Sequence, residues 1–167
     1  MNCSKYYFMY ENLKAIKINP LDDNLEIKLL NSLYLIYYLL SRKVPISILF
    51  IFLKNTIINW SINIKIFVIM KNQNVIHYTV IQNRKNQYLN LSNCHALEIG
   101  PSQTIFNFRN RGLYTYMINF LIQNLEKKLL FAIVRVNNVE SNQVFKKFNG
   151  THKMIIKYRF FISFYKN

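Results

Sequence analysis

From residue 62 onward, the order of apolar and polar residues predicts alternating strands and helices. Two runs rich in β-branched residues, 62–70 and 75–82, flank the polar tetrapeptide 71–74, which is typical of a hairpin. Between Gly112 and Leu130 the apolar residues recur at the spacing of one helix face, and the short apolar run 131–136 follows as a buried strand. This order is typical of a mixed α/β domain built around one sheet.

The N-terminal third of the chain predicts helices instead of strands. The capping residues Asp22, Asp23 and Asn24 precede an apolar segment, so we expect a helix from there to about Leu40. A second helix is expected over 45–54, because proline is tolerated in a first turn. The remaining expected elements are a strand at 96–104 broken by Gly100-Pro101, a short helix at 141–148 and a strand at 154–164.

The composition is consistent with one folded domain over residues 1–167, with 1–60 as an N-terminal helical part and 61–167 as its core. Hydrophobic residues make up 51% of the chain, which is enough for a buried core and excludes a disordered linker protein. The two cysteines, Cys3 and Cys94, form at most one disulfide and have no zinc-type spacing. We therefore expect neither a secreted disulfide scaffold nor a metal cofactor.

The formal net charge of +15 is consistent with an anionic partner such as a nucleic acid or a membrane surface. Lysines outnumber arginines sixteen to six, and no known nucleic-acid-binding motif accompanies them. A compositional bias is the simpler explanation, so no specific nucleic acid is expected. The apolar stretch 29–53 is interrupted by Ser41-Arg42-Lys43 and Pro45, which leaves pieces shorter than the ~20 residues of a membrane span. With no signal-peptide pattern either, we expect a cytoplasmic protein.

The three glycines lie where predicted elements meet, and Gly112 is the most informative of them. It follows Arg109-Asn110-Arg111 and opens a helix directly after a strand. Such a junction leaves backbone N–H groups without intrahelical partners, and these donors, the helix dipole and the two arginines suit a phosphate group. On these residues alone, an ordinary helix start with solvated arginines fits equally well.

The segment around this junction resembles the acetyl-CoA-binding strand–loop–helix of the GNAT acyltransferase superfamily. That family's motif is Arg/Gln-x-x-Gly-x-Gly/Ala, and Arg109 and Gly112 match its first two fixed positions. Tyr114 stands at the third position, where a small residue is usual. A subgroup of the family that modifies cell-surface glycans and small metabolites has an IGP…R-x-x-G-x-Y form, to which Ile99-Gly100-Pro101 and Tyr114 are similar.

A second stretch that resembles the family follows at the proper distance. The GNAT pattern there is Asn-x-x-Ser, then an aromatic residue, then Lys-Leu-Gly-Phe. Its counterparts in this chain are Asn138, Ser141, Phe145 and Lys147, with Asn149-Gly150 in place of the family's Gly-Phe. The resemblance covers roughly residues 62–164, and the N-terminal part is the more variable acceptor side.

The resemblance implies a GNAT-like fold, in which a central, mostly antiparallel sheet is flanked by helices. It also implies that the sheet is splayed between the strand carrying Thr104 and the strand carrying Ile133, so that the gap accepts the pantetheine arm of acetyl-CoA. The pyrophosphate would then bind N–H groups at the helix start. The cofactor-binding residues implied in this way are Thr104, Arg109, Asn110, Arg111, Gly112, Leu113, Tyr114, Thr115, Asn138, Ser141 and Phe145.

Acyl transfer by this fold is a direct attack on the thioester, which requires a base for the acceptor and an acid for the departing thiolate. Glu98 is the acidic residue on the motif strand, and we expect it to be the base. Strand alternation predicts that it shares a face with Gly100, Ser102 and Thr104. The alternatives are a solvated edge carboxylate at this position and, as the base, His77 or His95.

The sequence thus predicts an acyltransferase that moves an acetyl group from acetyl-CoA to an amine or hydroxyl of a small-molecule or sugar acceptor. The family's usual thiolate acid is a tyrosine at the position held here by Phe145. Either another tyrosine or water takes this role, or the protein is a degraded GNAT-like module that binds acyl-CoA without turnover, which is the first alternative function. A basic nucleic-acid-binding protein is the second.

Overall fold

The computed structural model describes residues 5–18, 24–30, 64–82, 96–125, 130–149, 151–157 and 162–164. Within these ranges the strands join into one eight-stranded sheet. The strands are β1 (Lys5–Glu11), β2 (Leu25–Leu30), β3 (Ile64–Lys71), β4 (Asn74–Gln82), β5 (Leu97–Thr104), β6 (Leu130–Arg135), β7 (Thr151–Lys157) and β8 (Ile162–Phe164). The helical segments are the short 3₁₀ helix η1 (Phe106–Phe108) and the α-helices α3 (Leu113–Asn124) and α4 (Val139–Lys147).

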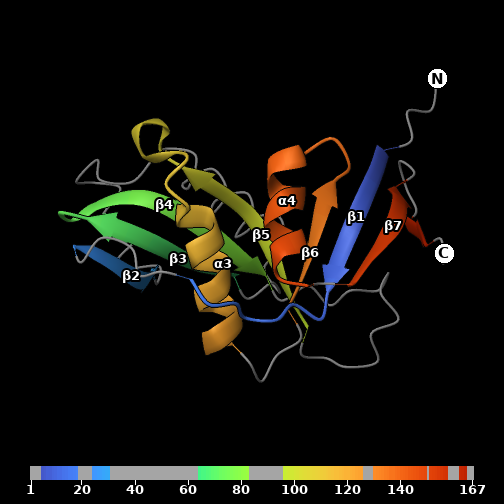
Figure 1. Ribbon diagram of the computed structural model, residues 1–167, viewed down its shortest axis with the longest axis horizontal. Coiled ribbons are helices and arrows are strands. Elements are labelled where there is room, and N and C mark those ends of the chain that lie inside the picture. Colours follow the sequence, from blue (N-terminus) through green and yellow to red (C-terminus); the bar gives the residue numbers. More distant parts are fainter. Residues whose placement is uncertain are drawn as a thin grey trace.

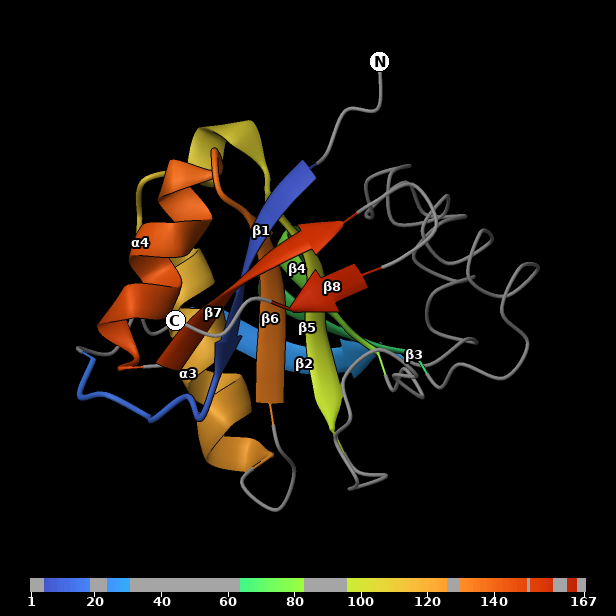
Figure 2. The same cartoon turned by 90° about the vertical axis from the view of Figure 1, so that its right-hand side faces the viewer.

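The strands follow the order β2-β3-β4-β5-β6-β1-β7-β8 across the sheet. Neighbours are antiparallel, with the exception of β5 and β6, which run parallel. Both α-helices lie on the same face of the sheet, with α3 packed against β4 and β5 (Figures 1 and 2). The predicted mixed α/β class with a mostly antiparallel sheet is confirmed.

The predicted hairpin is confirmed as β3 and β4. Its two turn residues, Asn72 and Gln73, have φ values of 49° and 63°, the left-handed conformation that the favoured two-residue hairpin turns require. From Val75 to Gln82 each side chain is buried, because β4 lies inside the sheet and is covered on both faces. The hairpin therefore carries its polar residues into the interior, where they lie close to the candidate site.

The predicted N-terminal helix is wrong over Leu25–Leu30, which form the edge strand β2 paired with β3. Leu25 and Ile27 are half-buried, whereas the charged residues that follow each of them are exposed. This two-residue alternation favours a strand, and it outweighs the capping residues in front of it. The continuation to Leu40 and the helix expected over 45–54 lie outside the described residues.

The sequence did not predict β1, which lies inside the sheet and pairs with β6 on one side and β7 on the other. Its Met9 and Tyr10 are buried, but the aromatic run before them shows neither a two-residue nor a helical period. Two further expectations need correction. The run 154–164, expected as one strand, forms the antiparallel pair β7 and β8, and β5 continues through Gly100-Pro101 without a break.

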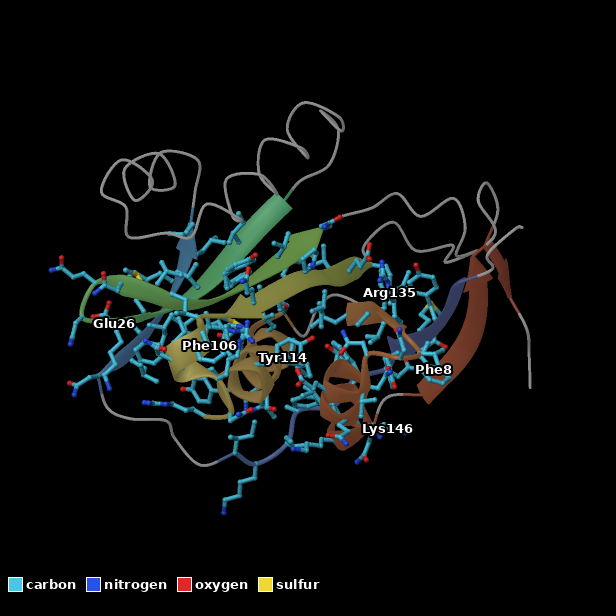
Figure 3. All side chains as sticks on the ribbon, turned by 90° about the horizontal axis from the view of Figure 1, so that it is seen from above. Phe8, Glu26, Phe106, Tyr114, Arg135 and Lys146 are labelled. Atoms are coloured by element: carbon cyan, nitrogen blue, oxygen red, sulfur yellow. The ribbon has the colours of Figure 1, made fainter. Side chains whose placement is uncertain are left out.

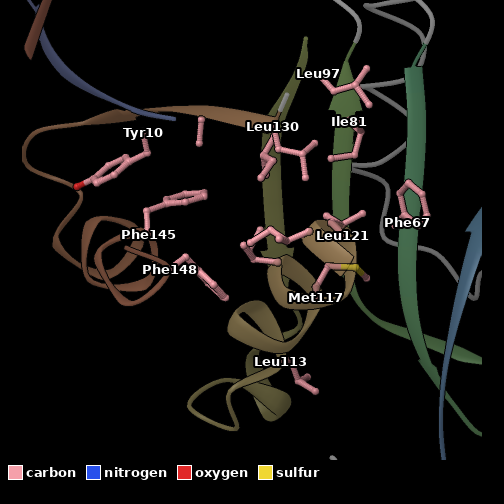
Figure 4. Packing of buried hydrophobic residues seen from close by; sticks show 14 of the residues in the cluster. Tyr10, Phe67, Ile81, Leu97, Leu113, Met117, Leu121, Leu130, Phe145 and Phe148 are labelled. Carbon is pink, nitrogen blue, oxygen red and sulfur yellow. The ribbon is translucent and has the colours of Figure 1, made fainter. Parts of the chain in front are cut away.

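The core fills the space between the sheet and the two helices, and Figure 4 shows it from close by. Met117 and Leu121 of α3 are fully buried in it, as are Phe145 of α4 and Phe148, which ends that helix. Tyr10 of β1 belongs to the same cluster, so both halves of the sheet share one core. This common core fixes α3 and α4 relative to the strands between which the candidate site lies.

Candidate functional site

The sheet splits between its two parallel strands. The ladder between β5 and β6 joins Leu97–Ile99 to Leu130–Ala132. Beyond these residues β5 continues to Thr104 in register with β4, and β6 continues to Arg135 beside β1. Figure 1 shows the two strands diverging toward their C-terminal ends. The splayed strand pair predicted from the sequence is therefore confirmed, and the gap between the strands opens toward α3 and α4.

A β-bulge at Gly100-Pro101 re-aims the last residues of β5. Ile99 pairs with Ile81 and Ser102 pairs with Thr79, so β5 has one residue more than β4 over this interval. Because Ile81 and Thr79 are two apart on β4, Ile99 and Ser102 point to the same face despite their odd spacing. That face is the one that α3 and α4 cover.

Gly100 is the residue that this bulge requires, for reasons of space. A Cβ atom at this position would lie 2.9 Å from Nε2 of Gln82 and 3.2 Å from the carbonyl oxygen of Val80. The carbonyl belongs to the backbone of β4 and cannot turn away. Glycine thus lets β5 bulge while it remains paired with β4.

Glu98 lies on the opposite face of β5 from Ser102 and Thr104. It pairs with Gln82, whereas Ser102 pairs with Thr79, and these two β4 residues point to opposite faces. The predicted common face is therefore wrong, because the bulge shifts the alternation by one residue. Glu98 is only 8% exposed, which excludes the solvated edge carboxylate. It lies in the paired part of β5, just before the gap opens.

The loop between β5 and α3 presents two arginines, each stacked on a phenylalanine. The guanidinium of Arg109 lies 5.4 Å from the ring centre of Phe106, and that of Arg111 lies 5.2 Å from Phe108. Nε of Arg109 also donates a hydrogen bond to the carbonyl of Thr104 at 3.3 Å. Both arginines are exposed, and Phe106 is 76% exposed on the loop (Figure 3). These contacts hold two positive charges beside the start of α3.

Gly112 begins α3 in the left-handed conformation, with φ 74° and ψ 4°. It has no side chain to cap the helix, and its carbonyl accepts the first intrahelical bond, from the N–H of Tyr116 at 2.9 Å. The N–H groups of Leu113, Tyr114 and Thr115 precede that bond and remain available to a ligand. Apart from its chain neighbours and its own helix, a Cβ atom at Gly112 would meet nothing within 4 Å, so the space beside the helix start is open.

Tyr114 lies in the first turn of α3, on the side toward α4 (Figure 3). Its hydroxyl makes side-chain hydrogen bonds with Ser102 of β5 and Ser141 of α4. Its ring centre is 6.2 Å from that of Phe145 in an edge-on contact and 5.9 Å from the ring of His77. Burial raises the pKa of Tyr114 to about 12, although both serine hydrogen bonds act in the opposite direction.

His77 is buried at 1% exposure, and both its ring nitrogens have hydroxyl partners. Nδ1 lies 2.8 Å from Oγ1 of Thr104, and Nε2 lies 3.0 Å from Oγ1 of Thr79. Burial lowers the pKa of His77 to about 4, so its imidazole is neutral at physiological pH. An imidazole held in this way positions Thr104 at the end of β5. His95, the other candidate, lies outside the described residues.

The predicted residues of α4 lie on the far side of the gap. Asn138 caps the helix, since its Oδ1 accepts a hydrogen bond from the N–H of Ser141 at 3.2 Å. Ser141 therefore has a fixed place in the first turn, from which its side chain reaches Tyr114. Phe145 is 1% exposed and packs between two tyrosines, stacked on Tyr10 at 5.3 Å and edge-on to Tyr114.

The sequence did not predict the hydrogen bonds that connect β1 to α4. The hydroxyl of Tyr10 donates to Oδ1 of Asn142 at 3.0 Å, and Nδ2 of Asn142 donates to the carbonyls of Arg135 and Val136. These bonds fix α4 to the end of β6, where the gap is widest. The available signal was a single asparagine one position after the Ser141 of the motif, and nothing nearby marked Tyr10 as its partner.

The arrangement fits a ligand that is anionic at one end and extended at the other. Anion donors and two arginines lie at the start of α3, and diverging strand edges lead from there toward Glu98. Among the residues that the structure describes, no group of three or more His, Cys, Asp or Glu side chains could hold a metal ion. The described part of the chain also has no helix long and apolar enough to cross a membrane.

Comparison with solved structures identifies this architecture. An acetyltransferase of the GNAT family from Colwellia psychrerythraea matches with a TM-score of 0.58 at 12% identity, over 98% of this chain and 56% of that one. A protein assigned to the same family from Novosphingobium aromaticivorans matches with a TM-score of 0.57 at 9% identity, over 93% of this chain and 64% of that one. The protein has a GNAT-like fold.

A third neighbour is a functionally unknown conserved protein from Staphylococcus epidermidis. It matches with a TM-score of 0.60 at 10% identity, over 93% of this chain and 62% of that one. This chain thus spans less than two thirds of the length of these neighbours. No protein-family profile and no curated protein sequence matches it. The similarity therefore lies in the fold.

Proposed function

We propose that this protein is an acyltransferase that moves an acetyl group from acetyl-CoA to an amine or hydroxyl of a small-molecule or sugar acceptor. The observation that carries the proposal is the split between β5 and β6, which lies beside the open N-terminus of α3. When bound, acetyl-CoA supplies an acyl group activated as a thioester. The chain supplies the binding surface, the alignment of the two substrates and the proton transfer.

The phosphate end of the donor binds at the start of α3. Here the N–H groups of Leu113, Tyr114 and Thr115 and the helix dipole favour an anion, and the missing side chain of Gly112 leaves room for it. Arg109, Asn110 and Arg111 complete the site, and the two arginines add positive charge. Asn110, like Gly112, has a positive φ, of 60°, so the loop turns sharply just before the helix.

The pantetheine arm binds along the gap, where it pairs with the free edge of β5 near Thr104 as an added strand would. Asn138, Ser141 and Phe145 form the opposite wall. Because Oδ1 of Asn138 caps α4, its Nδ2 group is the part of this amide that remains for the ligand.

Glu98 serves as the general base in this proposal. It lies where β5 and β6 are still paired, just before they diverge, and on the sheet face opposite the helices. The helices cover the donor side, so the acceptor approaches from the face on which Glu98 lies. The carboxylate takes the proton of the attacking amine or hydroxyl there. Residues 1–60 contribute to the acceptor side in this proposal. The proposal also includes a cytoplasmic location, because acetyl-CoA is supplied inside the cell.

The binding site can be tested with a matched pair of variants, Gly112→Asn and Gly112→Asp. Both side chains have nearly the same size and both tolerate a positive φ, so they differ mainly in charge. A ligand that binds only the native state raises stability by about 2.7 kcal/mol at a hundredfold excess over its dissociation constant. We expect acetyl-CoA to raise the melting temperature of the parent clearly, that of Gly112→Asn partly and that of Gly112→Asp hardly at all.

Melting temperatures are measured for each protein with and without acetyl-CoA. Equal rises in the parent and the aspartate variant would place the donor elsewhere. No rise in the parent would remove the basis of the acyltransferase proposal.

A second experiment tests the base and separates an enzyme from a binding module. Release of free thiol from acetyl-CoA is followed with a mixture of spermidine, lysine and glucosamine as probe acceptors. We expect Glu98→Gln to lower turnover by ~10²–10⁴-fold, the usual contribution of a general base, and to leave the acetyl-CoA melting shift unchanged. Equal turnover in parent and variant would show that Glu98 is not the base.

Phe145 favours a second candidate function, a module that binds acyl-CoA without turnover. This residue is buried and offers no hydroxyl at the position where the family has its thiolate acid. A parent protein that shows the melting shift but releases no thiol with any acceptor would support this candidate. A nucleic-acid-binding protein, supported by charge alone, would show neither.

A further inference from the structure

The departing sulfur needs a hydrogen-bond donor, and the residue at the usual position cannot provide one. Phe145 has no polar atom, and its ring is enclosed by Tyr10 on one side and Tyr114 on the other. Tyr10 commits its hydroxyl proton to Asn142. Among the described residues, the other tyrosine in contact with the Phe145 ring is Tyr114, whose hydroxyl is bonded to Ser102 of β5 and Ser141 of α4.

The position of this hydroxyl is set from both sides of the split. Ser102 belongs to β5, on one side of the gap, and Ser141 belongs to α4, on the other. The hydroxyl of Tyr114 is hydrogen-bonded to both, so it lies between β5 and α4. The rings of Phe145 and His77 pack against the tyrosine ring and hold its plane.

The hydrogen-bond inventory allows this hydroxyl to donate to a ligand. A phenol oxygen accepts two hydrogen bonds and has one proton to donate. Ser141 and Ser102 can each donate to it, although Ser102 also lies 3.4 Å from the carbonyl of Gly100, a long contact that its hydroxyl can give up by rotation. With both serines donating to the phenol oxygen, the proton of Tyr114 is available in the gap.

We propose that the Tyr114 hydroxyl is the hydrogen-bond donor to the sulfur of the acyl donor, in place of the tyrosine that Phe145 replaces. This inference rests on the proposed function. The acceptor's lone pair forms the new bond to the acyl carbon, and Glu98 takes the acceptor's proton. The carbon–sulfur bond breaks, and its electron pair goes to the sulfur. Tyr114 keeps its proton and shares it with the sulfur, which later takes a proton from water.

The properties of Tyr114 suit a donor that is not consumed. Burial raises the pKa of Tyr114 to about 12, well above the ~8.5 of a free alkyl thiol such as cysteine, so the proton stays on the tyrosine throughout. A neutral thioester sulfur is a weak acceptor, whereas the developing negative charge is a strong one. The hydrogen bond therefore gains strength as the bond to carbon breaks, which is the condition for a catalytic effect.

The test is an equilibrium measurement of free CoA bound to the protein. Ultraviolet absorbance of the thiolate gives the pKa of the bound thiol in the parent, in Tyr114→Phe and in the control Tyr116→Phe, which removes a hydroxyl from the same helix turn. We expect a thiol pKa about one to two units higher in Tyr114→Phe than in the other two, because hydrogen bonds to charged groups contribute about that much. Turnover should fall by ~10²-fold with an unchanged KM for acetyl-CoA.

The outcomes separate this inference from the function on which it rests. Equal thiol pKa values and equal turnover in parent and Tyr114→Phe would overturn the role of Tyr114 and leave the acyltransferase proposal standing. Loss of the CoA melting shift in Tyr114→Phe, or tighter binding and faster turnover, would also overturn it, because Tyr114 would then be a binding residue or an obstruction. A parent that binds no CoA would remove the proposed function, and this role with it.

Discussion

The candidate site contains single polar residues in apolar surroundings, and these surroundings change their pKa values. His77 is the clearest case, because its two nitrogens meet only hydroxyl groups and its neighbour Tyr114 is uncharged as well. Such surroundings disfavour a charged imidazole, which is why burial lowers the pKa of His77 to about 4. The residue thus holds Thr104 in place and makes the fold sensitive to acid.

The pH dependence of stability follows from this shift. Between pH 6.5 and about 4, His77 is protonated in the unfolded chain but not in the folded protein, so the unfolded state binds more protons. The stabilisation is complete above pH 6.5 and is lost as the pH falls toward 4. We expect the parent to lose about 2 kcal/mol more than His77→Gln between pH 7.5 and pH 5, measured by urea unfolding at each pH.

The comparison of parent and variant cancels the other titrating groups, because both proteins contain them. Equal losses in the two proteins would mean that the imidazole is charged in the folded state. A larger loss in the variant would mean that a neighbouring group stabilises the cation.

The residues of the candidate site were predictable where they belong to a motif. The contacts that these residues make in the folded protein were not. Gly112 was found from its position between two elements, and its positive φ agrees with that role. The predicted face of Glu98 is wrong because the extra residue of the bulge inverts the alternation of β5. No local sequence signal marks that extra residue. The bonds of Tyr114 to Ser102 and Ser141 join three separate elements, so they depend on the tertiary fold.

At the scale of elements, β5 depends most on a single residue. Its bulge separates the paired part that carries Glu98 from the edge that faces the gap. Gly100 permits the bulge because a larger residue would press against the Val80 carbonyl and the Gln82 amide. The residue that opens the site is thus also the residue on which the packing of β4 and β5 depends.

We expect Gly100→Ala to lower the free energy of unfolding by roughly 1–3 kcal/mol, the usual range for an overpacked interior. Urea unfolding of the parent, of Gly100→Ala, of Gln82→Ala and of the double variant measures it. Removing the Gln82 amide should restore part of the loss, since it relieves the 2.9 Å contact but not the contact with the Val80 carbonyl. A neutral Gly100→Ala would show that the bulge relaxes freely.

Elements with a strong local period were predicted well, and those stabilised by distant partners were not. The hairpin of β3 and β4 and the helix α3 carry their signals within about twenty residues of sequence. Strand β2 is short enough that capping residues in front of it suggested a helix. Strand β1 has no clear period, and its place in the sheet is set by β6 and β7, more than a hundred residues away.

At the scale of the whole molecule, the fold was predictable because two motifs with known spacing restrict the topology between them. The acceptor was not predictable, because no motif marks the residues that would bind it. The charge of +15 belongs to this scale as well. In the proposed function, Arg109 and Arg111 supply the positive charge beside the anion site. The remaining positive charge attracts anions in general.

The position of β1 has a consequence for folding during synthesis on the ribosome. This strand emerges more than a hundred residues before its two partners, β6 and β7. Until then the apolar side chains around Met9 and Tyr10 have no sheet to join, and the loop that closes at the end is long. The sheet should therefore close only once β6 and β7 have emerged, at the modest rate typical of non-local strand pairing.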